Sequence, residues 1–197
     1  PISTSACSSA ASRSSASLTV LERDGRLPIH PGAAPIDGLD PARVLAVEAT
    51  PAFITIVAAN GAFGPPPDVV LSGINRGPNT GHAVLHSGTV GAALTAATFG
   101  CRALAVSLAA AQPRHWDTAA DVAAQALDWL LSRAPDASVL NVNVPDLPAG
   151  RVRGLHPARL ASYGAVEATV GEPGLDHVTV TFTPLTTTGE PGTDAGL

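Results

Sequence analysis

Side chains that could hold a phosphate follow a short apolar run in this sequence. Residues 68–72 (DVVLS) lead into a loop rich in glycine and asparagine, and Ser87, Gly88 and Thr89 then open an apolar segment. Backbone N–H groups and hydroxyls at the start of a helix form a natural site for an anion. Asn75 and Asn79 add neutral oxygen ligands or amide donors from the same loop. The pattern indicates a phosphate-binding site.

The same residue types have a purely structural interpretation. Asn and Gly are the usual residues of turns, and Ser87 could act only as the N-cap of a helix. The roles of the two histidines in the loop, His82 and His86, also have two interpretations. His86 could donate to a phosphate or protonate a leaving alkoxide, and His82 could be a ligand, but either could be a loop residue without such a role. Composition alone does not choose between these interpretations.

The elements around the loop must place it at the edge of a sheet. Apolar runs predict buried strands over residues 68–72 and 103–108, and a further strand is predicted over residues 138–144, before Pro145. Helical spacing predicts helices over residues 87–100, which Gly100 ends, and 118–133, with Asp117 or Thr118 as the cap. This alternation predicts a three-layer α/β fold with a mainly parallel sheet. Ligands of such sheets bind beyond the carboxyl ends of the strands.

The flanking segments are less regular. We expect strands over residues 18–23 and 44–49, a helix over 52–60, loops over 28–41 and 73–86, and a half-exposed strand or hairpin arm over 177–182. Three parts follow from this pattern. Residues 1–17 are irregular, 18–156 form the α/β domain, and 157–197 form a C-terminal extension with a β-hairpin, which we interpret as incomplete.

Composition excludes several classes of protein. With 197 residues, 45% of them hydrophobic, the chain can bury a sizeable core. The net charge of -5 and the absence of a basic run argue against binding of long nucleic acid, although a mononucleotide needs only a local site. No apolar run reaches the roughly 18 residues of a membrane span. Cys7 and Cys101 form no metal or disulfide pattern, so we expect reduced thiols and a cytoplasmic location.

Two segments of the loop region resemble motifs of the SurE family. Residues 68–79 (DVVLSGINRGPN) and 84–90 (VLHSGTV) are similar to its two central signatures, and residues 103–108 and 140–145 match two further segments. Weaker similarity is found at residues 17–19, 50–51 and 192–194, so the resemblance extends over about residues 12–194. The sequence has no glycine fingerprint of a dinucleotide-binding enzyme after an early strand.

The resemblance implies a metal-dependent 5′/3′-nucleotidase that hydrolyses nucleoside monophosphates or other phosphate monoesters. It implies one divalent cation, Mg²⁺ or Mn²⁺, with ligands at Asn75 and at Ser12, for which Ser14 and Ser15 are alternatives. Asn79 and Ser87 would be the catalytic residues, and the phosphate would be bound by Asn79, Ser87, Gly88 and Thr89. In the family, C-terminal arms build dimers or tetramers, so a homo-oligomer is implied.

Several positions depart from the family pattern. The sequence contains no Asp-Asp pair, His82 replaces an acidic residue, and Phe53 stands where the family has Asp. Mg²⁺ and Mn²⁺ favour carboxylate oxygens, so these departures bear on metal binding. One hypothesis is an active nucleotidase whose aspartates lie upstream of Pro1. The alternatives are a non-catalytic nucleotide or phosphate binder and a truncated pseudoenzyme or fragment of the same fold.

Overall fold

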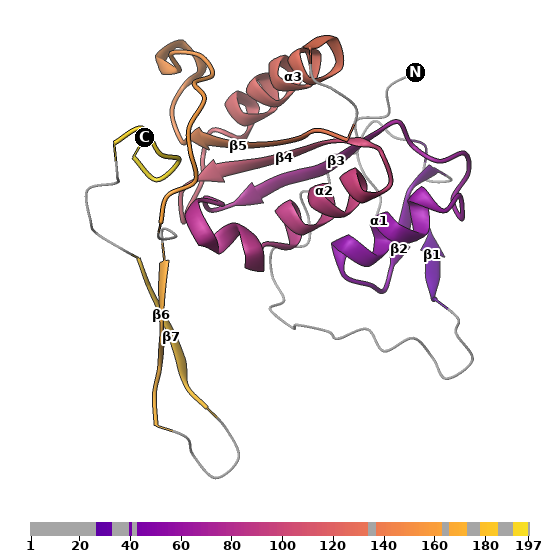
Figure 1. Cartoon of the computed structure of the whole chain (residues 1–197), viewed down its shortest axis with the longest axis horizontal. Coiled ribbons are helices and arrows are strands. Elements are labelled where there is room, and N and C mark those ends of the chain that lie inside the picture. Colours follow the sequence, from indigo (N-terminus) through magenta and orange to yellow (C-terminus); the bar gives the residue numbers. More distant parts are fainter. Residues whose placement is uncertain are drawn as a thin grey trace.

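The centre of the molecule is a parallel sheet. The computed structural model describes residues 27–32, 40, 43–133, 137–162, 166–172, 178–184 and 191–196. In this part of the chain, the sheet has the strand order β3-β4-β5, with β3 at Val69–Arg76, β4 at Arg102–Ala109 and β5 at Val139–Pro145. The helices α2 (Gly88–Thr98) and α3 (Trp116–Arg133) connect these strands (Figure 1).

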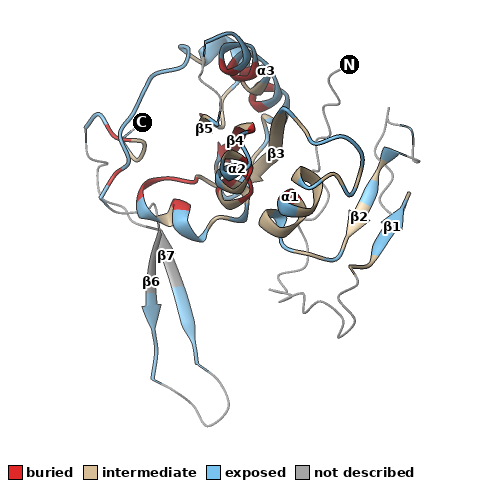
Figure 2. Ribbon diagram, turned by 45° about the vertical axis from the view of Figure 1, so that its right-hand side comes forward, coloured by how far each residue is buried: buried red, intermediate tan, exposed pale blue. Residues whose placement is uncertain are grey.

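The two helices cover opposite faces of the sheet. Alternate residues of β4 face opposite sides, and the larger ones, Leu104, Val106 and Leu108, pack against α3. The smaller ones belong to a second core cluster, in which alanines of the strand and the helix are packed together. These are Ala103 and Ala105 of β4, and Ala93 and Ala96 of α2. Figure 2 shows the buried residues concentrated between these layers. The predicted three-layer α/β fold is confirmed.

Helix α3 follows its predicted spacing. Its buried residues include Val122, Ala126 and Leu130, which share one face, and Leu130 has no exposed surface. The predicted cap is wrong, because the helix begins at Trp116 and therefore already includes Asp117 and Thr118. The predicted strand over 138–144 corresponds to β5.

The first strand of the sheet is longer than predicted. We expected residues 73–86 to be a loop, but β3 continues to Arg76, and a short 3₁₀ helix, η2, occupies Gly81–His86. The pairing of β3 with β4 shifts between Leu71 and Ile74, and Gly73 within this irregularity has φ +81°. Glycine adopts this backbone conformation without steric cost, so the strand resumes after the irregularity.

A small antiparallel pair and a helix precede the sheet. Strand β1 (Ile29–Pro31) pairs with β2 (Leu45–Val47), so the predicted loop over 28–41 is wrong at its start. Pro31 is compatible with a strand here because an edge strand does not need every N–H group. Helix α1 (Pro51–Ala59) confirms the helix predicted over 52–60 and packs on α2. Thr50 caps it by accepting a hydrogen bond from the Phe53 N–H at 3.4 Å.

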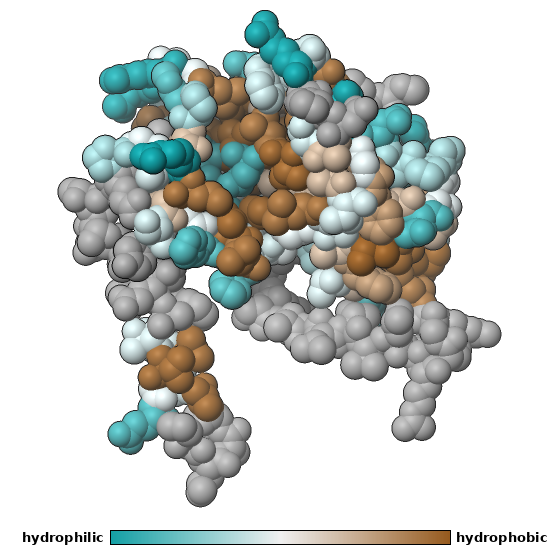
Figure 3. All heavy atoms as spheres, viewed as in Figure 1, coloured by the Kyte–Doolittle hydropathy of each residue, from teal (hydrophilic) through white to brown (hydrophobic). Residues whose placement is uncertain are grey.

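The C-terminal extension contains the expected hairpin. After the short helix η3 (Ala149–Arg151), strand β6 (Val166–Val170) pairs antiparallel with β7 (Val180–Pro184). The hairpin projects away from the sheet, and apolar residues gather on it (Figures 1 and 3). Residues 1–17, the strand predicted over 18–23 and Cys7 lie outside the described residues. In the described part of the chain, no helix combines the length and apolar character required to cross a membrane.

Candidate functional site

A row of polar residues crosses the sheet near the carboxyl ends of its strands. Asn75 of β3 is the register partner of Ser107 of β4, and Ser107 is the partner of Asn143 of β5. Their neighbours Ile74, Val106 and Val144 pack in the cluster around α3. Because side chains alternate along a strand, the three polar residues lie on the face that α2 covers. A polar surface is therefore built into this edge of an otherwise apolar face.

Asn79 holds the loop after β3 against this row. Its side-chain Nδ2 donates to Ser107 Oγ at 2.6 Å, and its backbone N–H donates to Asn143 Oδ1 at 2.8 Å. Its carbonyl oxygen accepts from Nδ2 of both Asn141 and Asn143, at 2.9 Å each. Asn79 is buried, and these contacts make it an anchor of the loop. Its predicted part in catalysis and phosphate binding stays a prediction.

Asn75 leaves one polar atom for a ligand. Its Nδ2 donates to the carbonyl oxygens of Arg76 at 3.3 Å and Gly77 at 2.8 Å. These bonds use the amide nitrogen and orient the side chain, so Oδ1 is the atom that could bind a cation. Ser12, the other predicted metal ligand, lies outside the described residues.

The start of α2 is a capped helix N-terminus. Ser87 is the N-cap, and its Oγ accepts from the Val90 N–H at 3.1 Å. Gly88 and Thr89 are the first residues of the helix, and N–H groups of a first turn lack partners within the helix. The capping interpretation of Ser87 is thus confirmed. Phosphate binding by Ser87, Gly88 and Thr89 remains a prediction, compatible with this cap.

The described residues do not by themselves fit a hard divalent cation. Among them, no cluster of three or more His, Cys, Asp or Glu side chains is placed to hold a metal ion. Asn75 offers one neutral oxygen, whereas Mg²⁺ is usually bound through at least one carboxylate together with several other oxygens. His82 and His86 are both exposed on η2.

Sequence reasoning missed the polar partners of the loop. It assigned no role to Ser107, Asn141 or Asn143, although polar residues at alternate positions of a predicted buried strand are a signal of a polar face. Two buried polar atoms in this region, Thr80 Oγ1 and Asn141 Oδ1, have no hydrogen-bond partner among the described residues. Both belong to neighbours of Asn79. Thr80 follows it in the sequence, and Asn141 donates a hydrogen bond to its carbonyl oxygen.

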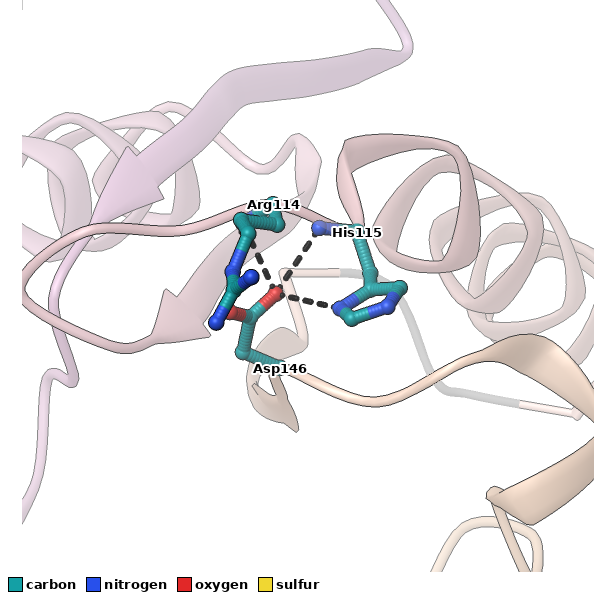
Figure 4. Close-up of polar contacts among 3 residues, drawn as sticks. All are labelled: Arg114, His115 and Asp146. Carbon is teal, nitrogen blue, oxygen red and sulfur yellow. Dashed lines mark hydrogen bonds and ion pairs between the residues drawn. The ribbon is translucent and has the colours of Figure 1, made fainter.

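A carboxylate after β5 organises the entry into α3. Asp146 Oδ1 accepts from the backbone N–H groups of Arg114 at 3.0 Å and His115 at 2.8 Å, and it contacts His115 Nδ1 at 2.9 Å (Figure 4). The backbone hydrogen bond from Arg114, followed by that from His115, lowers the pKa of the Asp146 carboxyl group. The charged carboxylate therefore connects the end of β5 to the start of α3.

Comparison with known proteins gives consistent matches. The family described as "Survival protein SurE" matches residues 2–166. The 5′-nucleotidase SurE of Methylococcus capsulatus is 42% identical over 125 residues, which is 63% of this chain and 50% of that protein. The 5′-nucleotidase SurE of Alkalilimnicola ehrlichii is 45% identical over 126 residues, covering 63% and 49%. The chain thus spans about half the length of these curated relatives.

A solved structure shows the same fold. The crystal structure of the SurE protein from Aquifex aeolicus superposes with a TM-score of 0.65 and covers 86% of this chain and 68% of that one. The sequence identity is 24%, so this likeness bears on the fold alone.

Proposed function

Since the chain belongs to the SurE family, we propose that it binds nucleoside monophosphates, or other phosphate monoesters, at the start of α2 and hydrolyses them as a 5′-nucleotidase. The observation that carries this proposal is the N-terminus of α2, capped by Ser87 and preceded by a loop that Asn79 anchors to the sheet. The relatives named 5′-nucleotidase SurE support the reaction class.

The phosphate would be held by dipoles and hydrogen bonds. The partial positive charge at a helix N-terminus attracts the phosphate, and the N–H groups of Gly88 and Thr89 are the donors nearest the cap. Position matters for this binding, because the donors must converge on one group. The anchored loop would keep these donors in a fixed position, since Asn79 connects the chain after β3 to both β4 and β5.

The metal belongs to the same proposal. A divalent cation would supply an activated water for hydrolysis, and the resemblance to the family implies ligands at Asn75 and Ser12. The single neutral oxygen that Asn75 contributes does not fit Mg²⁺ or Mn²⁺ on its own. That observation favours a second candidate function, a non-catalytic binder of the same phosphate ligands.

One pair of measurements separates the two candidates. Phosphate release from AMP and GMP is measured with Mn²⁺, with Mg²⁺ and with EDTA, and binding of the same nucleotides is measured by calorimetry. Release that requires a metal supports the nucleotidase. Binding heat without release under any condition supports the non-catalytic binder. The absence of both binding and release would reject both functions.

We also propose that the hairpin arm of β6 and β7 joins copies of this chain into a homo-oligomer. Val170 is paired with Val180, so these two side chains share one face of the hairpin, and Val178 lies two residues before Val180. The exposed fraction is 65% for Val170, 52% for Val178 and 45% for Val180. An apolar face on a projecting hairpin is a feature of surfaces that bury against another molecule. A second copy of the same arm has the matching apolar character.

A further inference from the structure

One carboxylate near the C-terminal end connects two distant segments. Asp194 Oδ1 accepts from the backbone N–H of Ala161 at 2.9 Å. The backbone N–H of Gly81 donates to both oxygens of Asp194, at 3.2 Å to Oδ1 and 3.0 Å to Oδ2. Gly81 and Ala161 are both buried, so their N–H groups depend on protein partners.

The Asp194 side chain is presented by an ordered piece of backbone. The Asp194 N–H donates to the Arg159 carbonyl oxygen at 2.9 Å, and the Arg159 N–H donates to the Gly192 carbonyl oxygen at 3.3 Å. Arg159 and Thr193 form a parallel bridge, and Thr193 is buried. The carboxylate therefore has a defined position and can define the position of its partners.

Gly81 is the first residue of η2, which leads directly to the cap of α2. It has φ +52°, a left-handed conformation that glycine adopts without steric cost, so the position of this residue depends on its hydrogen bonds and not on its own backbone preference. Asn79 fixes the loop two residues earlier, and Ser87 caps α2 six residues later. The hydrogen bonds to Asp194 meet the chain between these two points.

The geometry argues against Asp194 as a metal ligand. Both of its oxygens already accept backbone hydrogen bonds. A charged carboxylate that accepts such bonds makes stronger contacts than a neutral acceptor, which suits a structural connection.

We propose that Asp194 is a positioning residue for the phosphate site, acting by holding η2 at Gly81. This inference rests on the proposed function of that site. Ala161 and Asp194 also flank the hairpin in the sequence, so the same carboxylate closes the base of the arm. The position of the site loop is thereby tied to the C-terminal extension.

The test compares Asp194→Asn and Asp194→Ala with the unchanged 197-residue chain. Asp121→Asn is the matched control, because Asp121 is an exposed carboxylate on α3. Amide hydrogen exchange is followed at Gly81, at Ala161 and in α3. We expect exchange at Gly81 and Ala161 to rise about tenfold or more in Asp194→Ala, because both N–H groups lose their charged acceptor. The rise should be smaller in Asp194→Asn, which keeps a neutral acceptor oxygen. Exchange in α3 should not change.

The second readout is the Kd for AMP, measured by calorimetry. We expect it to increase about tenfold in Asp194→Ala and to stay constant in Asp121→Asn. Unchanged exchange at Gly81 would overturn the proposed connection. Faster exchange with an unchanged Kd would overturn the role in the site. If the unchanged chain binds no AMP, the proposed function fails and the role in the site with it, while exchange at Gly81 still decides whether Asp194 holds the loop.

Discussion

At the scale of single residues, the hydrogen bonds that Asp146 accepts favour its charged form. Two consecutive backbone N–H groups donate to it, those of Arg114 and His115, and they lower its pKa. A carboxyl group with a lowered pKa in the folded state adds stability above its unfolded pKa of about 3.9. This stability is lost as the pH falls towards the folded value.

We therefore expect the urea midpoint of the unchanged chain to decrease more steeply from about pH 5 to pH 3 than that of Asp146→Asn. Asp128→Asn is the control for the loss of a carboxylate, since Asp128 is exposed on α3. Equal slopes for the unchanged chain and Asp146→Asn would contradict the assignment.

Asn79 gives a second prediction at this scale. Asn79→Ala removes the donor to Ser107 Oγ, which is completely buried, and leaves that hydroxyl without this partner. An unsatisfied buried polar group costs about 1–3 kcal/mol, and we expect unfolding by urea to show a loss of this size. Asn60→Ala should cost less, because Asn60 is exposed and its side-chain Nδ2 donates to the Ile56 carbonyl oxygen of the adjoining helix. Equal losses would argue against the anchor.

The sequence indicated the loop at the end of the first buried strand but not how it is held. The partners of Asn79 lie 28 and 64 residues away, on β4 and β5. Nothing local in the sequence specifies such contacts, because they depend on the register of the strands. The Asp194 contact to Gly81 spans 113 residues and has the same origin.

At the scale of elements, α2 allows the structural and the ligand-binding roles of Ser87 to be separated. Ser87→Ala removes the cap, and thermal unfolding should show a loss of about 1 kcal/mol. Ser87→Asp keeps a capping oxygen and places a negative charge at the helix start, so stability should be maintained. The same charge would repel a phosphate, and calorimetry should detect no AMP binding. AMP binding by Ser87→Asp at the original affinity would place the phosphate elsewhere.

Two neighbouring leucines test the packing of α3 on the sheet. Leu130 is completely buried, whereas Leu131 is 38% exposed. Leu130→Ala should cost about 2–5 kcal/mol in the free energy of unfolding, because it removes apolar contacts and leaves a cavity. Leu131→Ala should cost clearly less. Chemical denaturation of both variants measures the difference, and similar losses would contradict the described face of the helix.

The elements that the sequence predicted well were those with a clear period. The helical spacing in α3 and the apolar run of β4 reflect burial, which the hydrophobic pattern of the sequence shows directly. Strand β5 was also predicted, although Asn141 and Asn143 interrupt its apolar residues. The misses were β1, which has only three residues, and the end of β3, where Ser72 and Gly73 interrupt the apolar run. The start of α3 was also missed, because Asp146 organises it from a different part of the chain.

At the scale of the whole molecule, the hairpin arm predicts a change in assembly. Val170→Asp places a charge on the apolar face of the arm and should shift the chain towards monomer. Thr169→Asp is the matched control, because adjacent residues of a strand lie on opposite faces. Sedimentation or light scattering of the two variants and the unchanged chain gives the masses. An unchanged chain that is monomeric at all concentrations would contradict assembly through the arm.

The alanines between α2 and β4 have a consequence for how this molecule can vary. Ala93, Ala96, Ala103 and Ala105 have no exposed surface, so only methyl groups separate the helix from the strand. A longer side chain at any of them would need space that a close-packed interior does not have. It would lift the helix and tilt the residues at its beginning. A substitution in this alanine layer would therefore change the geometry of the proposed phosphate site without altering any residue at the start of α2.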